Sequence, residues 1–183
     1  MIDVKLIEVG IIHEKKTSHS GLELDWRWDL DRLSNDAKDD LTEALDDLTR
    51  GCTVAGIERG GTRLTLTTDV SAILSVRHDK SIVIETQLCH WECSLRDDVV
   101  TTGRSMIDAE KALGKHGIKV VQRVCVLDRR EEWPSDHCPF AEYEDHPTFC
   151  SPPCIDTNLE ITSLFMTADL VEAGLVPDTK GTS

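Results

Sequence analysis

The sequence predicts an α/β fold in which a central, mainly parallel sheet is flanked by helices. Apolar residues at three- and four-residue spacing predict helices at residues 34–48 and from residue 106 onward. Each helix is followed by glycine and a short apolar strand, at residues 53–57 and 119–127. A helix-and-strand unit that repeats in this way favours parallel strands covered by helices.

Other segments complete this α/β prediction. Residues 72–76 and 159–165 are rich in apolar residues and predict two more strands, and residues 167–174 predict a short helix. Residues 63–70 alternate leucine with threonine, which by itself favours a strand.

Length and charge limit the class of protein. The 183 residues suffice for one domain with a sizeable core. A formal net charge of -14, with 34 acidic residues, repels nucleic acid and anionic lipid. The N-terminus has no signal-peptide pattern, and no apolar run approaches membrane-spanning length. We therefore predict one soluble, cytoplasmic domain, residues 1–183, that binds neither nucleic acid nor membranes. An acidic surface would also suit a salt-rich cytoplasm.

Residues 94–105, S-L-R-D-D-V-V-T-T-G-R-S, are the most informative stretch. Asp97 and Asp98 end a predicted strand, and a turn rich in hydroxyls around Gly103 opens the next helix. Such a turn points successive amides into one concavity, and the helix N-terminus adds partial positive charge, so a phosphate site is predicted. The two carboxylates need a different partner, such as sugar hydroxyls or a Mg²⁺ shared by sugar and pyrophosphate. Together these features indicate a phosphorylated sugar as the ligand.

Polar residues also follow two other predicted strands. Gly60 and Gly61 come just after residues 53–57 and allow the backbone to approach a ligand, while Arg59 beside them could reach a pyrophosphate. Cationic side chains also follow residues 72–76. Because ligands bind at the carboxyl ends of parallel strands, we expect these groups and the two carboxylates at one edge of the sheet.

Residues 97–105 resemble, in order and residue type, the phosphoribosyl pyrophosphate (PRPP) motif of the type I phosphoribosyltransferases. A similarity to the orotate phosphoribosyltransferases extends over nearly the whole chain. It implies the type I phosphoribosyltransferase fold, with a small N-terminal hood formed mainly by residues 1–30. It also implies that PRPP and orotate give orotidine monophosphate and pyrophosphate in the de novo synthesis of UMP. Mg²⁺ dependence and a homodimer, in which the loop of one subunit completes the neighbouring site, are further implications.

The resemblance assigns roles to individual residues. Asp97, Asp98 and Lys80 are implied to be catalytic. Arg129, Thr101 and His13 are implied to contact orotate, with Arg129 holding its carboxylate. The residues implied to bind PRPP are Arg59, Gly60, Gly61, Arg77, His78, Lys80, Asp97, Asp98, Val99, Val100, Thr101, Thr102, Gly103, Arg104 and Ser105.

Several positions depart from the orotate family and leave alternatives open. His13 stands where that family usually has lysine, and in the hood Leu24 and Arg27 replace a serine and an aromatic residue. Residues 81–92 contain neither the glycine nor the lysine of the family's mobile loop, and Arg96 occupies a position that is usually apolar. One alternative is a phosphoribosyltransferase for another base. The other is a catalytically weak PRPP-binding regulatory protein.

Three smaller features allow two interpretations each. The family has a helix at residues 63–70, and we follow it in spite of the strand-like pattern. Trp26 and Trp28 belong either to the core or to a surface over the base. Residues 134–158 are a proline-rich insertion that carries candidate zinc ligands, with free or buried thiols as the alternative among the seven cysteines of the chain. The candidate ligands are Cys138, His146, Cys150 and Cys154.

Overall fold

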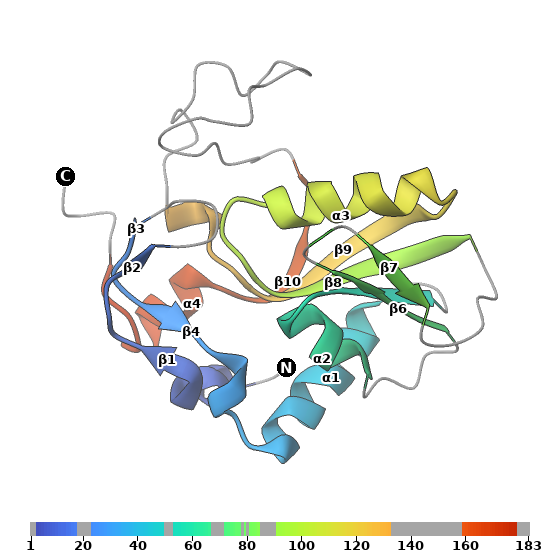
Figure 1. Cartoon of the computed structure of the whole chain (residues 1–183). Coiled ribbons are helices and arrows are strands. Elements are labelled where there is room, and N and C mark those ends of the chain that lie inside the picture. Colours follow the sequence, from blue (N-terminus) through green and yellow to red (C-terminus); the bar gives the residue numbers. More distant parts are fainter. Residues whose placement is uncertain are drawn as a thin grey trace.

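A computed structural model describes residues 3–17, 23–49, 53–66, 72–77, 79, 81–84, 91–132 and 159–178. A six-stranded sheet in the order β10-β9-β8-β5-β6-β7 forms its centre (Figure 1). Five of these strands are parallel to one another, and β7 pairs with β6 in the antiparallel sense. The predicted mainly parallel sheet is therefore confirmed. The strands are β5 (Thr53–Ile57), β6 (Ala72–Val76), β7 (Ile82–Ile84), β8 (Glu92–Val100), β9 (Lys119–Asp128) and β10 (Thr162–Met166).

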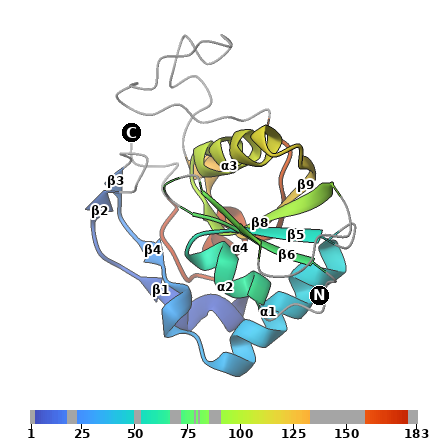
Figure 2. The same ribbon diagram turned by 45° about the vertical axis from the view of Figure 1, so that its right-hand side comes forward.

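Helices cover both faces of this sheet. α1 (Asn35–Leu48) and α2 (Gly60–Leu66) lie on one face, and α3 (Arg104–Lys115) lies on the other, which Figure 2 shows from a second direction. The hydroxyl of Ser34 caps α1 by accepting the amide of Ala37 at 3.2 Å. The short α4 (Thr167–Glu172) follows β10 directly.

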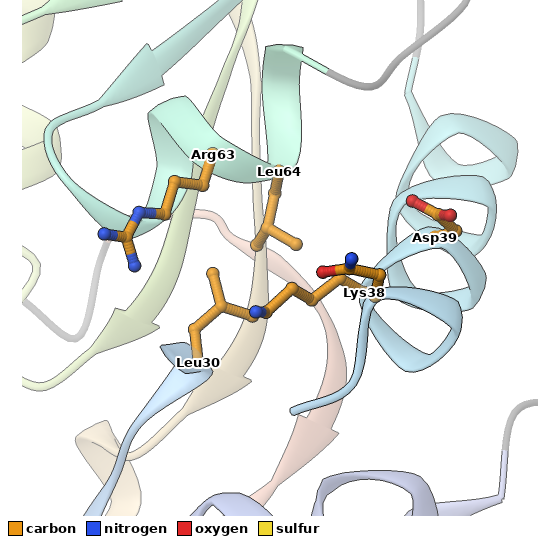
Figure 3. A pocket seen from close by; sticks show the side chains of 6 residues that line it. Leu30, Lys38, Asp39, Arg63 and Leu64 are labelled. Carbon is orange, nitrogen blue, oxygen red and sulfur yellow. The ribbon is translucent and has the colours of Figure 1, made fainter. Parts of the chain in front are cut away.

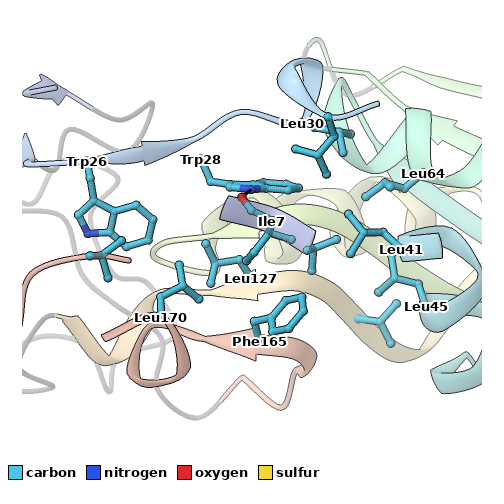
Figure 4. Close-up of a cluster of buried hydrophobic side chains, with 14 residues drawn as sticks. Ile7, Trp26, Trp28, Leu30, Leu41, Leu45, Leu64, Leu127, Phe165 and Leu170 are labelled. Carbon is cyan, nitrogen blue, oxygen red and sulfur yellow. Dashed lines mark hydrogen bonds between the residues drawn. The ribbon is translucent and has the colours of Figure 1, made fainter. Parts of the chain in front are cut away.

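Each face of the sheet has its own hydrophobic core. Leu41 and Leu45 of α1 pack with Leu64 of α2 against β9 and β10 (Figure 4). On the opposite face, Met106 and Ala109 of α3 pack against β5, β8 and β9. The helical spacing of these residues predicted which side of each helix is buried.

The N-terminal region forms a small hood beside the sheet. It consists of two 3₁₀ helices, η1 (Val4–Gly10) and η2 (Leu30–Arg32), and of two antiparallel strand pairs. β1 (Ile11–Ile12) pairs with β4 (Arg27–Trp28), and β2 (Lys16–Thr17) pairs with β3 (Glu23–Leu24).

Both tryptophans of the hood are buried. Trp26 is fully buried, and Trp28 donates its indole N–H to the carbonyl of Ile7 at 2.9 Å (Figure 4). Their packing joins the hood to the core shared with α1 and α2. The core alternative for these two residues is therefore correct.

Some element boundaries differ from the prediction. β8 continues to Val100, so Asp97 and Asp98 lie within the strand and do not end it, because pairing with β9 extends as far as Val100 and Asp128. The helix predicted at residues 63–70 is confirmed for residues 63–66, and residues 67–70 lie outside the described residues. α2 begins earlier than predicted, at Gly60. β10 begins at Thr162, later than residue 159, and η3 (Arg130–Glu132) was not foreseen.

β7 was not predicted either. Residues 81–92 were compared with a mobile loop, yet Ile82–Ile84 adds an antiparallel edge strand to β6. Its three β-branched residues are typical of a strand.

In the described part of the chain, none of the helices combines the length and the hydrophobicity required to cross a membrane. Cys93 and Cys125 are free thiols buried in the core against α3.

Candidate active site

Two neighbouring carboxylates lie near the carboxyl end of β8, the central strand. Asp97 is only 7% exposed, and Asp98 is partly buried. The amide of Asp98 donates to the Asp97 carboxylate at 3.0 Å, and the amide of Val99 donates to the Asp98 carboxylate at 2.9 Å. We call Asp97 and Asp98 the acidic pair.

Burial makes the ionised form of the acidic pair unfavourable. It raises the pKa of Asp97 well above its ordinary value, and the adjacent Asp98 carboxylate raises it further. Burial also raises the pKa of Asp98, and Asp29 in the hood contributes to this rise. Among the residues that the structure describes, neither carboxylate forms an ion pair with a cation. The acidic pair is therefore suited to an external partner that donates hydrogen bonds or carries positive charge.

The beginning of α2 is pressed against the acidic pair. A Cβ atom on Gly60 would lie 2.0 Å from the carboxyl carbon of Asp98, and one on Gly61 would lie 2.2 Å from the carbonyl oxygen of Arg96. Only glycine permits such an approach of two backbones. Arg59 precedes the two glycines and is exposed, and the peptide bond between Glu58 and Arg59 is cis. The structure thus brings Gly60 and Gly61 to the acidic pair, and Arg59 directly precedes them in the chain.

A tight turn separates β8 from α3. Gly103 has φ 80° and ψ −6°, in the left-handed region, and it occupies the N-cap of α3. Thr102 is buried, and its hydroxyl accepts the amide of Arg104 at 3.3 Å. We call residues 101–105 the phosphate turn after the phosphate site predicted there; its glycine cap stands at the positive end of a 12-residue helix. Thr101 is partly buried, and Ser105 is exposed.

Of the other predicted cationic and histidine site residues, the structure describes only some. Arg77 is exposed directly after β6, and its amide donates to the carbonyl of Ser81 at 3.0 Å. The amide of Glu58 donates to Val76, so the ends of β5 and β6 lie together. His78 and Lys80 fall outside the described residues. His13 is exposed just after β1 in the hood.

Arg129 differs most from its expected state. It follows β9, and its amide donates to the carbonyl of Val100 at 2.8 Å, so it stands at the correct edge of the sheet. Its side chain, however, is only 2% exposed. The guanidinium donates to the Glu132 carboxylate from Nε at 2.6 Å and from a terminal nitrogen at 2.7 Å. The expected carboxylate site is thus filled by a carboxylate of the same chain.

Trp26 of the hood completes the surroundings of Arg129. The guanidinium carbon lies 3.6 Å from the centre of the indole ring, and the other terminal nitrogen donates to the Trp26 carbonyl at 3.0 Å. Neither Trp26 nor Glu132 was predicted to contact Arg129. The sequence did contain a signal for the contact with Glu132. In a 3₁₀ turn, an acidic residue three positions after an arginine lies on the same side as that arginine.

The donor set of the acidic pair suits Mg²⁺. Mg²⁺ prefers oxygen ligands and is commonly held by one or two carboxylates together with substrate phosphates and water. In the described part of the chain, no group of three or more His, Cys, Asp or Glu side chains could hold a metal ion. A magnesium site here would therefore need oxygens from the substrate. All four predicted zinc ligands lie outside the described residues.

A separate pocket lies between η2, α1 and α2, with a volume of about 290 Å³ (Figure 3). Arg63, which lines it, also forms an ion pair with Asp31. None of the predicted site residues lines this pocket, and we assign it no role. Its lining consists of Leu30, Asn35, Lys38, Asp39, Arg63 and Leu64.

Comparison with known proteins supports one fold. No family model matches the chain. The orotate phosphoribosyltransferase of Leptospira biflexa is 49% identical over 39 residues, which is 21% of this chain and 21% of the relative. The chain therefore matches about a fifth of the length of this curated relative.

Solved structures match over nearly the whole chain. The orotate phosphoribosyltransferase of Mycobacterium tuberculosis in complex with PRPP has a TM-score of 0.61 and 21% identity, covering 91% of this chain and 95% of that chain. The adenine phosphoribosyltransferase of Leishmania tarentolae has a TM-score of 0.56 and 14% identity, covering 92% and 89%. The chain has the type I phosphoribosyltransferase fold. Since proteins named for different bases share this fold, it does not by itself identify the base.

Proposed function

We propose that this protein is an orotate phosphoribosyltransferase that transfers the phosphoribosyl group of PRPP to orotate, giving orotidine monophosphate and pyrophosphate. The observation that carries the proposal is the acidic pair, with the Gly60–Gly61 backbone against it and the phosphate turn just beyond the end of the same strand. A phosphate site beside two carboxylates that form no ion pair within the described residues suits a phosphorylated sugar better than a simple anion. The short identity to an orotate phosphoribosyltransferase supports orotate as the base.

Each part of the site would bind one part of PRPP. The phosphate turn would anchor the 5-phosphate through its amides and hydroxyls. The acidic pair would hold the ribose hydroxyls, while Arg59, Arg77 and Lys80 would take the charge of the pyrophosphate. Val99, Val100 and Arg104 would contribute as parts of the same backbone run.

The reaction requires no covalent nucleophile. The bond between the anomeric carbon and the pyrophosphate oxygen breaks, a bond to a ring nitrogen of the base forms, and that nitrogen loses its proton. Positive charge develops on the sugar as pyrophosphate leaves, and the acidic pair would stabilise it. Mg²⁺, which the acidic pair and substrate oxygens would hold, supplies neutralisation of the leaving group when bound.

The state of Arg129 favours a second candidate, a phosphoribosyltransferase for a base without a carboxylate. An Arg129 fork that already binds Glu132 becomes available to the orotate carboxylate only when Glu132 is displaced. A neutral base would leave this ion pair in place. The third alternative, a PRPP-binding regulator, rests only on the lack of glycine and lysine in residues 81–92.

One pair of measurements separates these functions. PRPP is titrated by calorimetry with and without Mg²⁺, and pyrophosphate release is then assayed with orotate, uracil, hypoxanthine and xanthine. We expect PRPP to bind and orotate to give the fastest release. Faster release with another base would support the second candidate. Binding without turnover on any base would support the regulator, and no PRPP binding would refute all three.

The acidic pair provides the sharpest variant. We expect Asp97→Asn with Asp98→Asn to lower turnover by at least about 100-fold, the size of effect seen when one charge-stabilising group is lost. Asp39→Asn with Asp40→Asn is the matched control, since it removes two adjacent exposed carboxylates of α1. Wild-type rates in the first variant would refute the assigned role.

We also propose an oligomeric state, a cellular location and a metal site in the insertion at residues 134–158. The family resemblance supports a homodimer, which light scattering of the purified protein would test. It also supports a cytoplasmic enzyme. For zinc at Cys138, His146, Cys150 and Cys154, elemental analysis decides between a bound metal and free thiols. Less than about a tenth of an equivalent would exclude the site, since a structural zinc is bound tightly.

A further inference from the structure

The Arg129 and Glu132 side chains form a complete, two-bond ion pair inside the protein. Their N–O distances are 2.6 Å and 2.7 Å, and the side chains are 2% and 5% exposed. Arginine presents parallel N–H groups that match a carboxylate in this way, and a ligand carboxylate would use the same groups. One carboxylate therefore fills this edge of the guanidinium at a time.

Glu132 is itself held from the other side. The hydroxyl of Thr167, the first residue of α4, donates to the same Glu132 oxygen that accepts from Nε of Arg129, at 2.7 Å. Thr167 is buried. Trp26 covers the face of the guanidinium, so the ion pair is enclosed by the hood, β9 and α4.

We propose that Glu132 is an internal competitor for the carboxylate site of Arg129, and that a base bearing a carboxylate must displace it in order to bind. The inference rests on the proposed function, because it concerns the base site of that same reaction. Glu132 thereby becomes a specificity-determining residue. It disfavours carboxylate-bearing bases and has no direct effect on neutral ones.

The charges explain the direction of this effect. The positive guanidinium is paired with the buried carboxylate of Glu132. Adding a second carboxylate while Glu132 stays would bury an unpaired negative charge, which is strongly unfavourable. Glu132 must therefore leave the guanidinium, and the affinity for the carboxylate ligand is lowered by the free energy of that separation. Glutamine in its place keeps the shape but loses the charge, so it competes less.

The test compares Glu132→Gln with wild type by calorimetric titration of orotate, of uracil and, separately, of PRPP. We expect orotate to bind at least about tenfold more tightly to the variant, a gain of about 1.4 kcal/mol. Uracil and PRPP should bind within about twofold of wild type. Glu131→Gln is the matched control: it removes the same charge one residue earlier, where the Glu131 carboxylate accepts the amide of Ala168 at 2.7 Å.

Unchanged or weaker orotate binding in Glu132→Gln, with PRPP binding retained, would overturn the inference. Loss of orotate binding alone would show that Glu132 positions Arg129 and does not compete for it. Failure of wild type to bind PRPP would refute the proposed function separately, since the orotate titration needs no PRPP. If Glu132→Gln does not fold, Thr167→Val removes only the hydroxyl that holds Glu132. That variant should bind orotate about threefold more tightly, and equal or weaker binding would count against the proposal.

Discussion

Asp97 and Asp98 lie near the carboxyl end of β8 although burial opposes their ionisation. The pKa of each is raised, with desolvation as the main cause. Replacing both carboxylates with neutral residues would be expected to increase the stability of the fold. Their presence is therefore consistent with a site that trades stability for function.

This arrangement predicts a pH-dependent stability. Below the ordinary value of 3.8, both carboxyls are protonated in the folded and the unfolded states. As pH rises through the raised folded-state pKa values, the folded state loses stability, because the unfolded chain releases these protons more readily. Asp97→Asn with Asp98→Asn removes this loss. We expect urea unfolding to show little difference between variant and wild type near pH 4 and greater stability of the variant at pH 8. A gap that narrows as pH rises would contradict the raised pKa values.

Arg96 shows where sequence reasoning stops at the residue scale. The sequence marked it as unusual, since an arginine replaces an apolar residue beside the acidic pair. Its partners come from two helices: the Asp46 carboxylate at 2.8 Å, the Thr49 hydroxyl at 2.9 Å and the Leu64 carbonyl at 2.9 Å. No spacing rule joins these positions, because their proximity depends on how α1 and α2 pack. The same holds for Trp26 and Arg129, which are 103 residues apart.

At the scale of elements, the sequence predicted the helices and strands with clear periodicity, and it did not predict the short edge strand β7. α1, α3, β5 and β9 have clear periodicity or continuous apolar runs, and all four were found. α2 needed the family resemblance, because its alternating leucine and threonine favour a strand. As a helix, α2 can bury Leu64 in the core and at the same time place Gly60 and Gly61, one turn earlier, against β8. β7 was missed because an edge strand of three residues carries too little pattern.

The two ends of α3 offer a matched test of the phosphate turn. Gly103 at its start and Gly117 just after its end both have left-handed backbones, with φ 80° and 75°. Alanine at either position should cost about 1–2 kcal/mol of stability, because its Cβ is strained there. Only Gly103→Ala should weaken PRPP binding, by at least about tenfold, since it distorts the amides of the turn. Urea unfolding measures the stability of both variants, and calorimetric titration measures their affinity for PRPP. Equal PRPP affinity in the two variants would remove the phosphate role of the turn.

The contact between α2 and β8 gives a second test at this scale. Gly61→Ala should destabilise the protein by about 1–3 kcal/mol, because its Cβ would meet the Arg96 carbonyl and force two backbones apart. The control is Gly114→Ala in α3, where no atom lies within 4 Å of the added Cβ. That change should stabilise by about 0.5–1 kcal/mol, since alanine favours the helix. Chemical unfolding of both variants measures the difference. If Gly61→Ala left the free energy of unfolding unchanged, α2 and β8 would not be so closely packed.

For the whole molecule, acidic residues outnumber lysines and arginines, 34 to 20. Arg59 and Arg77 are exposed at the carboxyl ends of β5 and β6. Elsewhere carboxylates dominate, and the net charge is -14. A single-sign surface repels itself in the compact state and weakens folding unless ions screen it. Such a field would also repel anionic substrates at long range, so their attraction to Arg59 and Arg77 would have to act locally.

Screening by salt should therefore stabilise the protein. Between 0.05 M and 1 M KCl the Debye length falls to about 3 Å, which suppresses repulsion between surface carboxylates. We expect the thermal midpoint to rise by about 5 °C, or roughly 1–2 kcal/mol for a chain of this size. A variant with Asp39→Asn, Asp40→Asn and Glu43→Gln, all exposed on α1, should show a smaller rise from a higher starting midpoint. Calorimetric scans of both proteins across the salt series measure this. If the midpoint stays constant or falls with KCl in wild type, surface repulsion does not limit its stability, and the acidic composition needs another explanation.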